Sequence, residues 1–313
     1  MEVFDDARQR VVLGHRRAST TPSPQVTDPR DTGPRNHQET LMSSPEQFAV
    51  EEISPSYWRV TFSNGEINLI DPDTTEQLAA LITRIEEAPE LTAVVFRSAN
   101  PDFFMAHWDM RSDRSRVAAM KPASSGLHPF ADNLYRLAKV PAATITEING
   151  RARGAGSEFV LATDIRFAGP GAILGQFEVG VGSVPGGNPT GRLPRLLGRG
   201  RALEILLGAD DFPADLAAAY GYVNRVVAAG ELEAFVDGFA RRVAGFDKVA
   251  VARTKSLVDV ESLPTPESYG ASLQAFFQTS GRPENAHRIR SLFERGLQRP
   301  DGVELDLGRC LAE

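Results

Sequence analysis

Residues 149–190 read NGRARGAGSEFVLATDIRFAGPGAILGQFEVGVGSVPGGNPT and say most about the fold. The preceding residues 141–148 (PAATITEI) have the β-branched pattern of a strand, and Asn149-Gly150 supplies a turn signal. A loop of small residues, 154–157 (GAGS), then leads to a helix predicted for 158–163, and residues 165–168 (IRFA) are a second strand. This succession is typical of a layered α/β domain.

The same alternation extends toward the N-terminus. Strands are predicted for residues 57–62 (YWRVTF) and 91–96 (LTAVVF), and a helix for residues 130–139. Another helix is predicted from apolar residues that recur at helical spacing, namely Leu78, Leu81, Ile82 and Ile85. Strands that alternate with helices predict the α/β class.

The two ends of the chain differ from this core. After about residue 200 the pattern becomes helical, with predicted helices around 266–279 and 285–297 and an apolar stripe at Leu232, Phe235, Phe239 and Val243. Residues 1–41 hold four prolines and charges of both signs with almost no apolar periodicity, so we expect a disordered extension. The folded domain is then 42–313, with a core of about 50–200 and a helical part of about 200–300.

Composition excludes several classes of protein. The 313 residues include 34 Lys and Arg against 41 Asp and Glu, and this net charge of −7 argues against nucleic acid as the main partner. No apolar run is long enough to span a bilayer, so we expect no membrane partner. Cys310 is the only cysteine, which excludes an internal disulfide framework and favours a reducing, cytoplasmic location.

The glycine-rich loop lacks the common phosphate-binding and hydrolase motifs. A dinucleotide-binding G-x-G-x-x-G from Gly154 would need glycine where Phe159 stands, and neither G-x-x-x-x-G-K-[ST] nor G-x-S-x-G occurs. Glu158 has a simple explanation as a carboxylate that complements the helix dipole, and Glu178 as a solvated loop charge. Together they could form a general acid–base pair, but their spacing does not determine whether they meet.

Residues 103–110 (FFMAHWDM) are unusually aromatic for a loop. The simplest interpretation is that the loop packs on the core and that His107 is structural, because the five histidines show no metal-ligand spacing. A local basic cluster has two interpretations, a solvated face or a site for the phosphates of a ligand or of RNA. Its members are Arg151, Arg153, Arg192, Arg195, Arg199 and Arg201. No aromatic-interleaved RNA motif supports the second interpretation.

Three blocks together resemble the crotonase (enoyl-CoA hydratase/isomerase) superfamily over roughly residues 50–300. Residues 104–110 (FMAHWDM) are similar to the family's F-x-A-G-x-D-[LI], and residues 149–168 to its N-G-x-x-x-G-G-G-x-E…D-x-x-x-A. Residues 174–196 are similar to F-G-x-P-E-x-x-x-G-x-x-P-G-x-G-G-x-x-R-L. The resemblance implies a spiral of ββα turns with C-terminal helices, assembled as a homotrimer or hexamer.

The resemblance also implies a site. Trp108 and Ala155 match the residues whose backbone N–H groups form the family's oxyanion hole, and Glu158 and Glu178 match the two catalytic glutamates of its hydratase branch. The family's CoA-thioester channel is lined at the positions of Ala106, Trp108, Asp109, Met110, Arg111 and Ala155. The implied reaction is a hydro-lyase reaction, the addition of water across the C2=C3 bond of a trans-2-enoyl-CoA, with no metal and no cofactor besides the CoA of the substrate.

This sequence departs from the family pattern at several positions. His107 replaces the usual glycine, Trp108 a common alanine, Ala155 the middle glycine, and Phe177 the usual proline. Two other interpretations therefore stay open. One is Δ3–Δ2 enoyl-CoA isomerisation, which needs a single base, and the other is a non-catalytic acyl-CoA-binding protein, since a fold does not guarantee its chemistry.

Overall fold

The computed structural model describes residues 45–312, so the extension predicted for residues 1–41 lies outside the described part of the chain. The strands are β1 (Phe48–Ser54), β2 (Tyr57–Phe62), β3 (Ala93–Ser98), β4 (Phe103–Met105), β5 (Ala143–Ile148), β6 (Arg151–Arg153), β7 (Ile165–Ala168), β8 (Ile173–Gly175), β9 (Asp211–Pro213) and β10 (Arg225–Val226). The α-helices are α1 (Pro72–Glu87), α2 (Arg114–Ala119), α3 (Pro129–Lys139), α4 (Ala155–Ala162), α5 (Pro189–Leu197), α6 (Arg199–Gly208), α7 (Ala214–Tyr220), α8 (Leu232–Ala244), α9 (Lys248–Ser262), α10 (Pro266–Ser280), α11 (Pro283–Glu294) and α12 (Leu307–Leu311). Two short 3-10 helices are η1 (Glu178–Val181) and η2 (Val303–Asp306).

The strands form two sheets whose order reveals a spiral. One sheet runs β1-β2-β3-β5-β7-β10 and is parallel apart from the β1–β2 pair, and the other runs β4-β6-β8-β9. Consecutive strands alternate between the sheets, so β3, β5 and β7 belong to the first and β4, β6 and β8 to the second. Each such strand pair is followed by helical structure. This is the predicted ββα spiral with C-terminal helices, and the fold class is confirmed.

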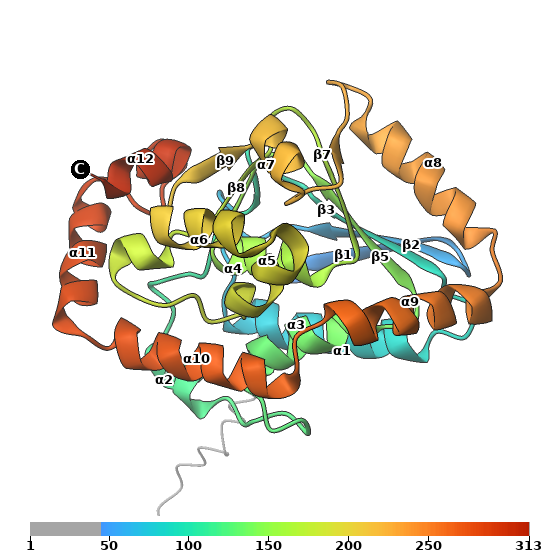
Figure 1. The fold of residues 1–313 in the computed structure, drawn as a ribbon, viewed down its shortest axis with the longest axis horizontal. Coiled ribbons are helices and arrows are strands. Elements are labelled where there is room, and N and C mark those ends of the chain that lie inside the picture. The colour runs from blue at the N-terminus through green and yellow to red at the C-terminus, as the bar shows by residue number, and fades with distance from the viewer. Residues whose placement is uncertain (1–44, 313) are drawn as a thin grey trace, which may run out of the picture. The chain divides into compact units, whose positions relative to one another are not determined.

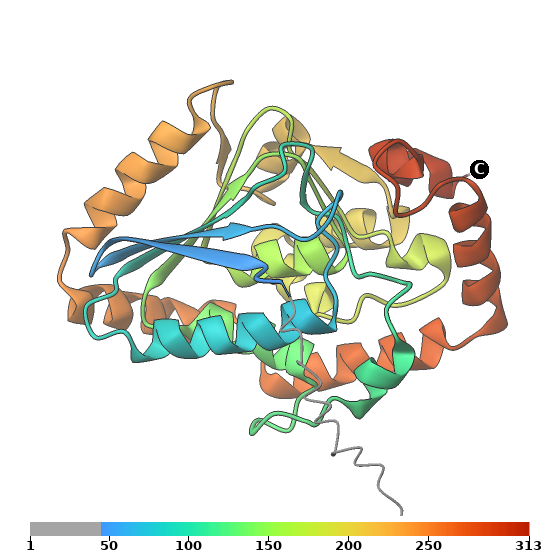
Figure 2. The same cartoon turned by 180° about the vertical axis from the view of Figure 1, so that it is seen from behind.

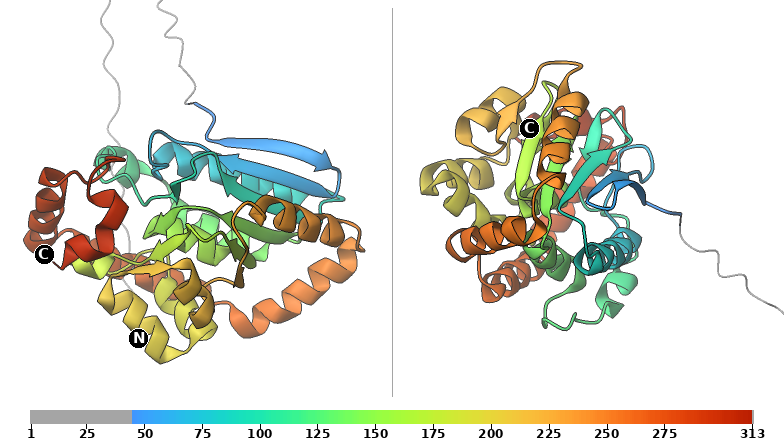
Figure 3. Two further views of the ribbon diagram at one scale, coloured as in Figure 1. Left: turned by 90° about the horizontal axis from the view of Figure 1, so that it is seen from above. Right: turned by 90° about the vertical axis from the view of Figure 1, so that its right-hand side faces the viewer.

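Helices cover both faces of the six-stranded sheet (Figure 1). On β3, Val94 and Phe96 join the core cluster that contains α1, α3 and α4, while Ala93 and Val95 pack with α8 on the other face. Figure 2 shows the β1–β2 hairpin running above α1. The C-terminal helices α11 and α12, red in Figure 3, lie at the end of the domain away from α8.

Helix α1 illustrates how the sequence sets these elements. The Asp71 carboxylate accepts the Thr74 N–H at 2.7 Å and the Thr74 hydroxyl accepts the Asp71 N–H at 3.0 Å, which is a capping box. Pro72 occupies the first turn, where its missing N–H costs nothing. The stripe predicted at Leu78, Leu81, Ile82 and Ile85 is buried.

Besides shifts of a few residues at element ends, the structure differs from the sequence expectation in three segments. The loop 154–157 is largely the first turn of α4, which begins at Ala155 because Gly154, with φ +47°, caps it. The loop predicted for 103–110 contains the short strand β4. The C-terminal part is not purely helical, since it supplies β9 and β10. In residues 45–312 no helix is long and apolar enough to cross a membrane.

Candidate active site

Two segments far apart in the sequence meet at the N-terminus of α4. A Cβ built on Gly156 would lie 1.9 Å from the Met105 carbonyl oxygen, so the end of β4 runs directly against the first turn of α4. The Arg153 N–H also donates to the Ala106 carbonyl at 3.1 Å. We call residues 107–110, which continue from this contact, the oxyanion loop. The loop therefore lies beside the helix that carries Ala155 and Glu158.

Both predicted oxyanion amides are unpaired within residues 45–312. Ile70 donates to the His107 carbonyl at 2.8 Å and accepts the Asp109 N–H at 2.7 Å, so the intervening Trp108 N–H points away from this bridge. Ala155 is the first residue of α4, whose opening amides have no intrahelical acceptor. Neither N–H donates to another group in the described part of the chain. Free amides beside the positive end of a helix dipole favour a developing oxyanion.

Glu158 is a buried carboxylate held by a backbone amide. Its Oε1 accepts the Gly187 N–H at 2.7 Å, and a Cβ on Gly187 would lie only 2.3 Å from its Oε2. Burial raises the pKa of Glu158 to about 7, because desolvation outweighs the hydrogen bond from Gly187 that favours the ionised form. Its pKa thus lies close to neutral pH, where a general base or acid is most useful.

Glu178, the first residue of η1, is the second buried carboxylate. A Cβ on Gly154 would lie 2.6 Å from its Oε1, so the carboxylate contacts the residue that caps α4. Its Oε2 is buried without a hydrogen-bond partner in residues 45–312. Burial and the neighbouring charge of Glu158 both raise the pKa of Glu178 well above its usual value. The structure thus brings the two glutamates together, which their spacing alone could not establish.

The residues predicted to line the channel differ in their burial and in their contacts. Trp108 is half-buried, and its ring packs edge-on against Phe130 with centroids 5.7 Å apart. Ala106 is fully buried in a small apolar cluster. Arg111 is exposed, with its guanidinium 4.7 Å from the centre of the Phe293 ring.

Asp109 and Met110 are both tied to the C-terminal segment. The Asp109 carboxylate accepts from the Gln298 side-chain amide at 2.5 Å, and the Met110 N–H donates to the same side chain at 3.1 Å. Of the predicted lining residues, Trp108 and Ala155 are the two whose own amides are the predicted oxyanion donors.

Sequence reasoning missed two contributors to the site. Gly187 supplies the amide that holds Glu158, and its only signal was the Gly186-Gly187 pair in the block 174–196. The partner of His107 is Glu304, for which the sequence carried no signal. His107 itself was interpreted as structural, and the structure shows it fully buried.

The basic cluster is not one surface. Arg153 is buried and pairs with Asp211 at 2.6 Å, and Arg192 is buried and donates to the Leu161 carbonyl at 3.0 Å. For these two arginines, both the solvated-face and the phosphate-binding interpretations are wrong, because their guanidinium groups are used inside the fold. No group of three or more potential metal ligands occurs in residues 45–312.

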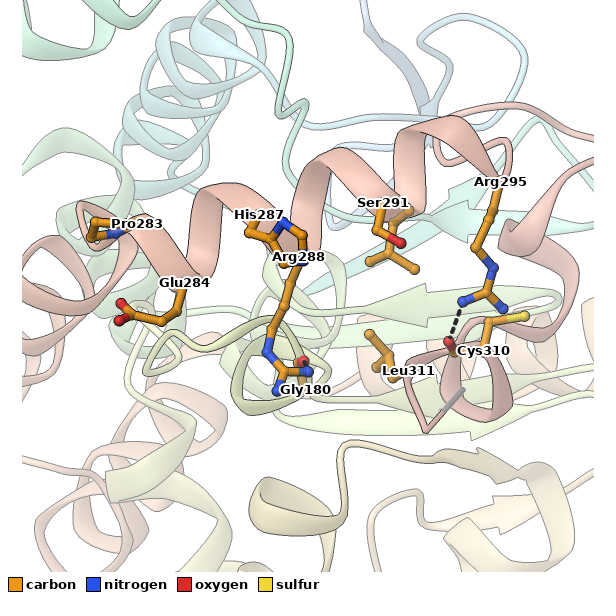
Figure 4. Close-up of a pocket in the computed structure, with 10 residues that line it drawn as sticks. Gly180, Pro283, Glu284, His287, Arg288, Ser291, Arg295, Cys310 and Leu311 are labelled. Carbon is orange, nitrogen blue, oxygen red and sulfur yellow. Dashed lines mark hydrogen bonds between the residues drawn. The ribbon is translucent and has the colours of Figure 1, made fainter.

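Two other cavities lie away from the glutamates. One, of about 610 Å³, is bounded by α11, Gly180 and α12, with Arg288 and Arg295 on its wall (Figure 4). The other, of about 780 Å³, lies between the end of α4 and α9. Neither is lined by Glu158 or Glu178. The paired carboxylates and the free amides, rather than the volume of a cavity, therefore identify the candidate site.

The enoyl-CoA hydratase/isomerase family profile matches residues 52–287. The chain belongs to this family. It is 31% identical over 194 residues to the short-chain-enoyl-CoA hydratase of Clostridium acetobutylicum, an alignment that covers 62% of this chain and 73% of that protein. It is 30% identical over 210 residues to the crotonyl-CoA hydratase of Syntrophomonas wolfei, covering 67% and 79% of the two chains.

A solved structure supports the same family assignment. The crystal structure of a proposed enoyl-CoA hydratase from Streptomyces avermitilis superposes with a TM-score of 0.81 at 40% identity, covering 88% of this chain and 99% of that one. With the two relatives, this likeness marks the chain as an enzyme of the hydro-lyase type, in a family that acts on CoA thioesters.

Proposed function

We propose that this protein adds water across the C2=C3 double bond of a trans-2-enoyl-CoA. The observation that carries the proposal is the meeting of two buried carboxylates, Glu158 and Glu178, at the N-terminus of α4 beside two unpaired backbone amides. Hydration needs one group to take a proton from water and another to give a proton to carbon. Two carboxylates whose environments differ are suited to that division of labour.

The hydrogen bonds support one division of the two roles. Glu158 is the base, since the Gly187 N–H stabilises its ionised form, and Glu178 is the acid, since its unpartnered Oε2 and the Glu158 charge favour its protonated form. The water oxygen bonds to C3 while Glu158 takes its proton. The π electrons of the double bond move to the thioester oxygen, which the Trp108 and Ala155 N–H groups bind as an enolate. The enolate then collapses, and C2 takes the proton of Glu178.

One proton must return from Glu158 to Glu178 before the next turnover, because the first residue gains a proton and the second loses one. The charge of Glu158 contributes to the raised pKa of Glu178, which supports return of that proton within the pair. The reaction as written consumes one water and needs no metal and no cofactor beyond the CoA of the substrate.

The test follows the ultraviolet absorbance of the conjugated thioester during incubation with trans-2-enoyl-CoAs of short and medium chain length. We expect loss of absorbance with the wild-type protein and a decrease of at least about 100-fold in rate for Glu158→Gln and Glu178→Gln, the lower bound for acid–base groups. Glu147→Gln is the matched control, because Glu147 is another partly buried carboxylate with a raised pKa but lies on β5 away from the site. Full activity in either site variant contradicts the proposal.

A second incubation, with a 3-enoyl-CoA, separates the alternatives. Isomerisation of a 3-enoyl-CoA uses the same amides but only one carboxylate, so it would increase the absorbance and survive one of the two substitutions. A protein that only binds acyl-CoA would leave the absorbance unchanged. The presence of a second buried glutamate supports hydration over both.

We also propose that the protein assembles as a homotrimer or hexamer in the cytoplasm. The support is α9, which buries none of its own residues within the described chain and exposes several apolar side chains. These are Val249, Leu257, Val258 and Val260. Exposed apolar surface of this kind marks an interaction site. Light scattering after gel filtration tests the assembly, and a monomeric mass contradicts it.

A further inference from the structure

The oxyanion loop is fastened to the C-terminal segment by a buried ion pair. His107 Nε2 lies 2.8 Å from Glu304 Oε1, and the two side chains are 1% and 0% exposed. The other ring nitrogen, Nδ1, lies 2.7 Å from the carbonyl oxygen of Trp108. His107 therefore connects Glu304 to the residue whose N–H is the predicted oxyanion donor.

The contacts of His107 fix its protons. A carbonyl oxygen can only accept, so Nδ1 must carry a hydrogen that it donates to Trp108. The Nε2–Glu304 contact then needs a second proton, which the pair shares between an imidazole and a carboxylate. Burial alone would lower the pKa of His107, but the charge and hydrogen bond of Glu304 raise it. The charge of Arg153 lowers the pKa values of both His107 and Glu304. Arg153 is itself paired with Asp211.

Backbone bonds make the orientation of the loop specific. Ile70 holds the peptide groups on both sides of Trp108, and a trans peptide directs its N–H opposite to its C=O. The His107 carbonyl faces Ile70, so the Trp108 N–H faces away from it, and the Trp108 carbonyl faces the His107 ring. Rotation of either peptide would break a bond to Ile70 or to His107.

Gln298 provides a second attachment to the same loop. Its side chain bonds to the Met110 N–H and the Asp109 carboxylate, and its own N–H donates to Glu304 Oε1 at 2.8 Å. Gln298 has φ +62°, a left-handed conformation that is strained for a residue other than glycine, asparagine or aspartate. A glutamine in that conformation indicates that its side-chain contacts with Asp109 and Met110 are the reason for this residue at this position.

We propose that His107, Gln298 and Glu304 are positioning residues that hold the oxyanion loop so that the Trp108 N–H is aimed at the thioester oxygen. The inference rests on the proposed function, because it concerns how the oxyanion hole is built. Hydrogen bonds to the oxyanion strengthen in the transition state, so loss of positioning lowers kcat more than it changes KM.

The test compares four variants of the full chain. Glu304→Ala removes the partner of His107, and Gln298→Gly removes the second attachment while relieving the left-handed strain, so it keeps the protein folded if Glu304→Ala does not fold. Glu304→Gln keeps the shape and an oxygen that can accept the Gln298 N–H, but it removes the charge that pairs with His107, so it separates loss of the ion pair from loss of the whole side chain. Asp301→Asn is the control, because Asp301 lies in the same turn but pairs only with the exposed Arg299 among the contacts described.

Two readouts are measured on each variant. The first is kcat and KM for hydration, with kcat expected to fall about tenfold to 100-fold in Glu304→Ala and Gln298→Gly, to fall less in Glu304→Gln, and to stay within about threefold of wild type in Asp301→Asn. The second is the ultraviolet band of bound 2,4-hexadienoyl-CoA, which moves to longer wavelength when its carbonyl oxygen is hydrogen-bonded. This shift, recorded before hydration removes the band, reports the oxyanion hole independently of kcat, and it should decrease in Glu304→Ala and Gln298→Gly.

The outcomes separate the two proposals. A wild-type protein that neither hydrates enoyl-CoAs nor shifts the band overturns the proposed function and the inference with it. A wild-type shift that Gln298→Gly leaves unchanged, with kcat unchanged, overturns the inference alone. A loss in Glu304→Gln as large as in Glu304→Ala also overturns it, because the glutamine keeps the bond to the Gln298 N–H.

Discussion

Replacement of Glu158 by glutamine is expected to abolish hydration and yet stabilise the folded protein above pH 7. The pKa of Glu158 is about 7 in the folded protein, against 4.5 for an exposed glutamate. The folded state therefore binds this proton more tightly than the unfolded state, so the free energy of unfolding falls as pH rises from about 4.5 to about 7 and then levels off.

The size of this destabilisation follows from the shift in the pKa of Glu158. A difference of about 2.5 pKa units at about 1.4 kcal/mol per unit gives about 3 kcal/mol of destabilisation at pH 8, and under about 1 kcal/mol at pH 5. Glutamine has the same shape, its side-chain oxygen can still accept the Gly187 N–H, and it does not ionise. The variant should therefore recover most of this free energy at pH 8 and little of it at pH 5.

Urea unfolding at pH 5, 6.5 and 8 measures the effect as the difference in unfolding free energy between variant and wild type. Glu304→Gln provides a control of opposite sign, because Glu304 is buried but its pKa is lowered by His107, so its ionised form stabilises the fold. The reasoning is refuted if Glu158→Gln is no more stable than wild type at pH 8, or if its advantage does not change with pH.

The dependence of kcat/KM on pH is expected to be bell-shaped, with an acid limb near pH 7 where Glu158 loses its proton and an alkaline limb where Glu178 does. Initial rates between pH 5.5 and 9 check this, and a flat profile argues against both roles. Gly156→Ala is expected to cost about 3 kcal/mol or more, because its Cβ would overlap the Met105 carbonyl, whereas Gly238→Ala, in open space on α8, should gain up to about 1 kcal/mol. Thermal unfolding measures both changes, and a Gly156→Ala protein as stable as wild type would show that β4 does not pack on α4 as described.

Local pattern was sufficient for most of the fold. The strands at 57–62 and 165–168 follow from β-branched and aromatic runs, and the helix at 130–139 follows from its apolar spacing. Boundaries set by backbone detail were not predictable. The start of α4 at Ala155 depends on Gly154 adopting positive φ against Phe177 and Glu178, a contact between segments separated in sequence.

The site was predictable as a set of residues but not as a geometry. Glu158 and Glu178 stood out by their place in the family pattern, yet their spacing did not show that burial raises both pKa values, or that the charge of Glu158 raises the pKa of Glu178 further. The partner of His107 lies 197 residues away, on a segment with no motif, so no reading of local pattern could pair it with Glu304. Arg153 was interpreted as part of a solvated face or a phosphate site, but it is buried. A cluster of cations in the sequence does not indicate which of them the fold buries.

The measurement that tests the account most directly is the mass of the product formed from a trans-2-enoyl-CoA in heavy water and in ¹⁸O-labelled water. Hydration with Glu178 as the acid predicts a 3-hydroxyacyl-CoA that carries one deuterium at C2 and one labelled oxygen at C3. The wild-type protein should form this product and Glu178→Gln should not. Recovery of unlabelled thioester, of an isomer with no added oxygen, or of the same labelled product from Glu178→Gln would contradict it.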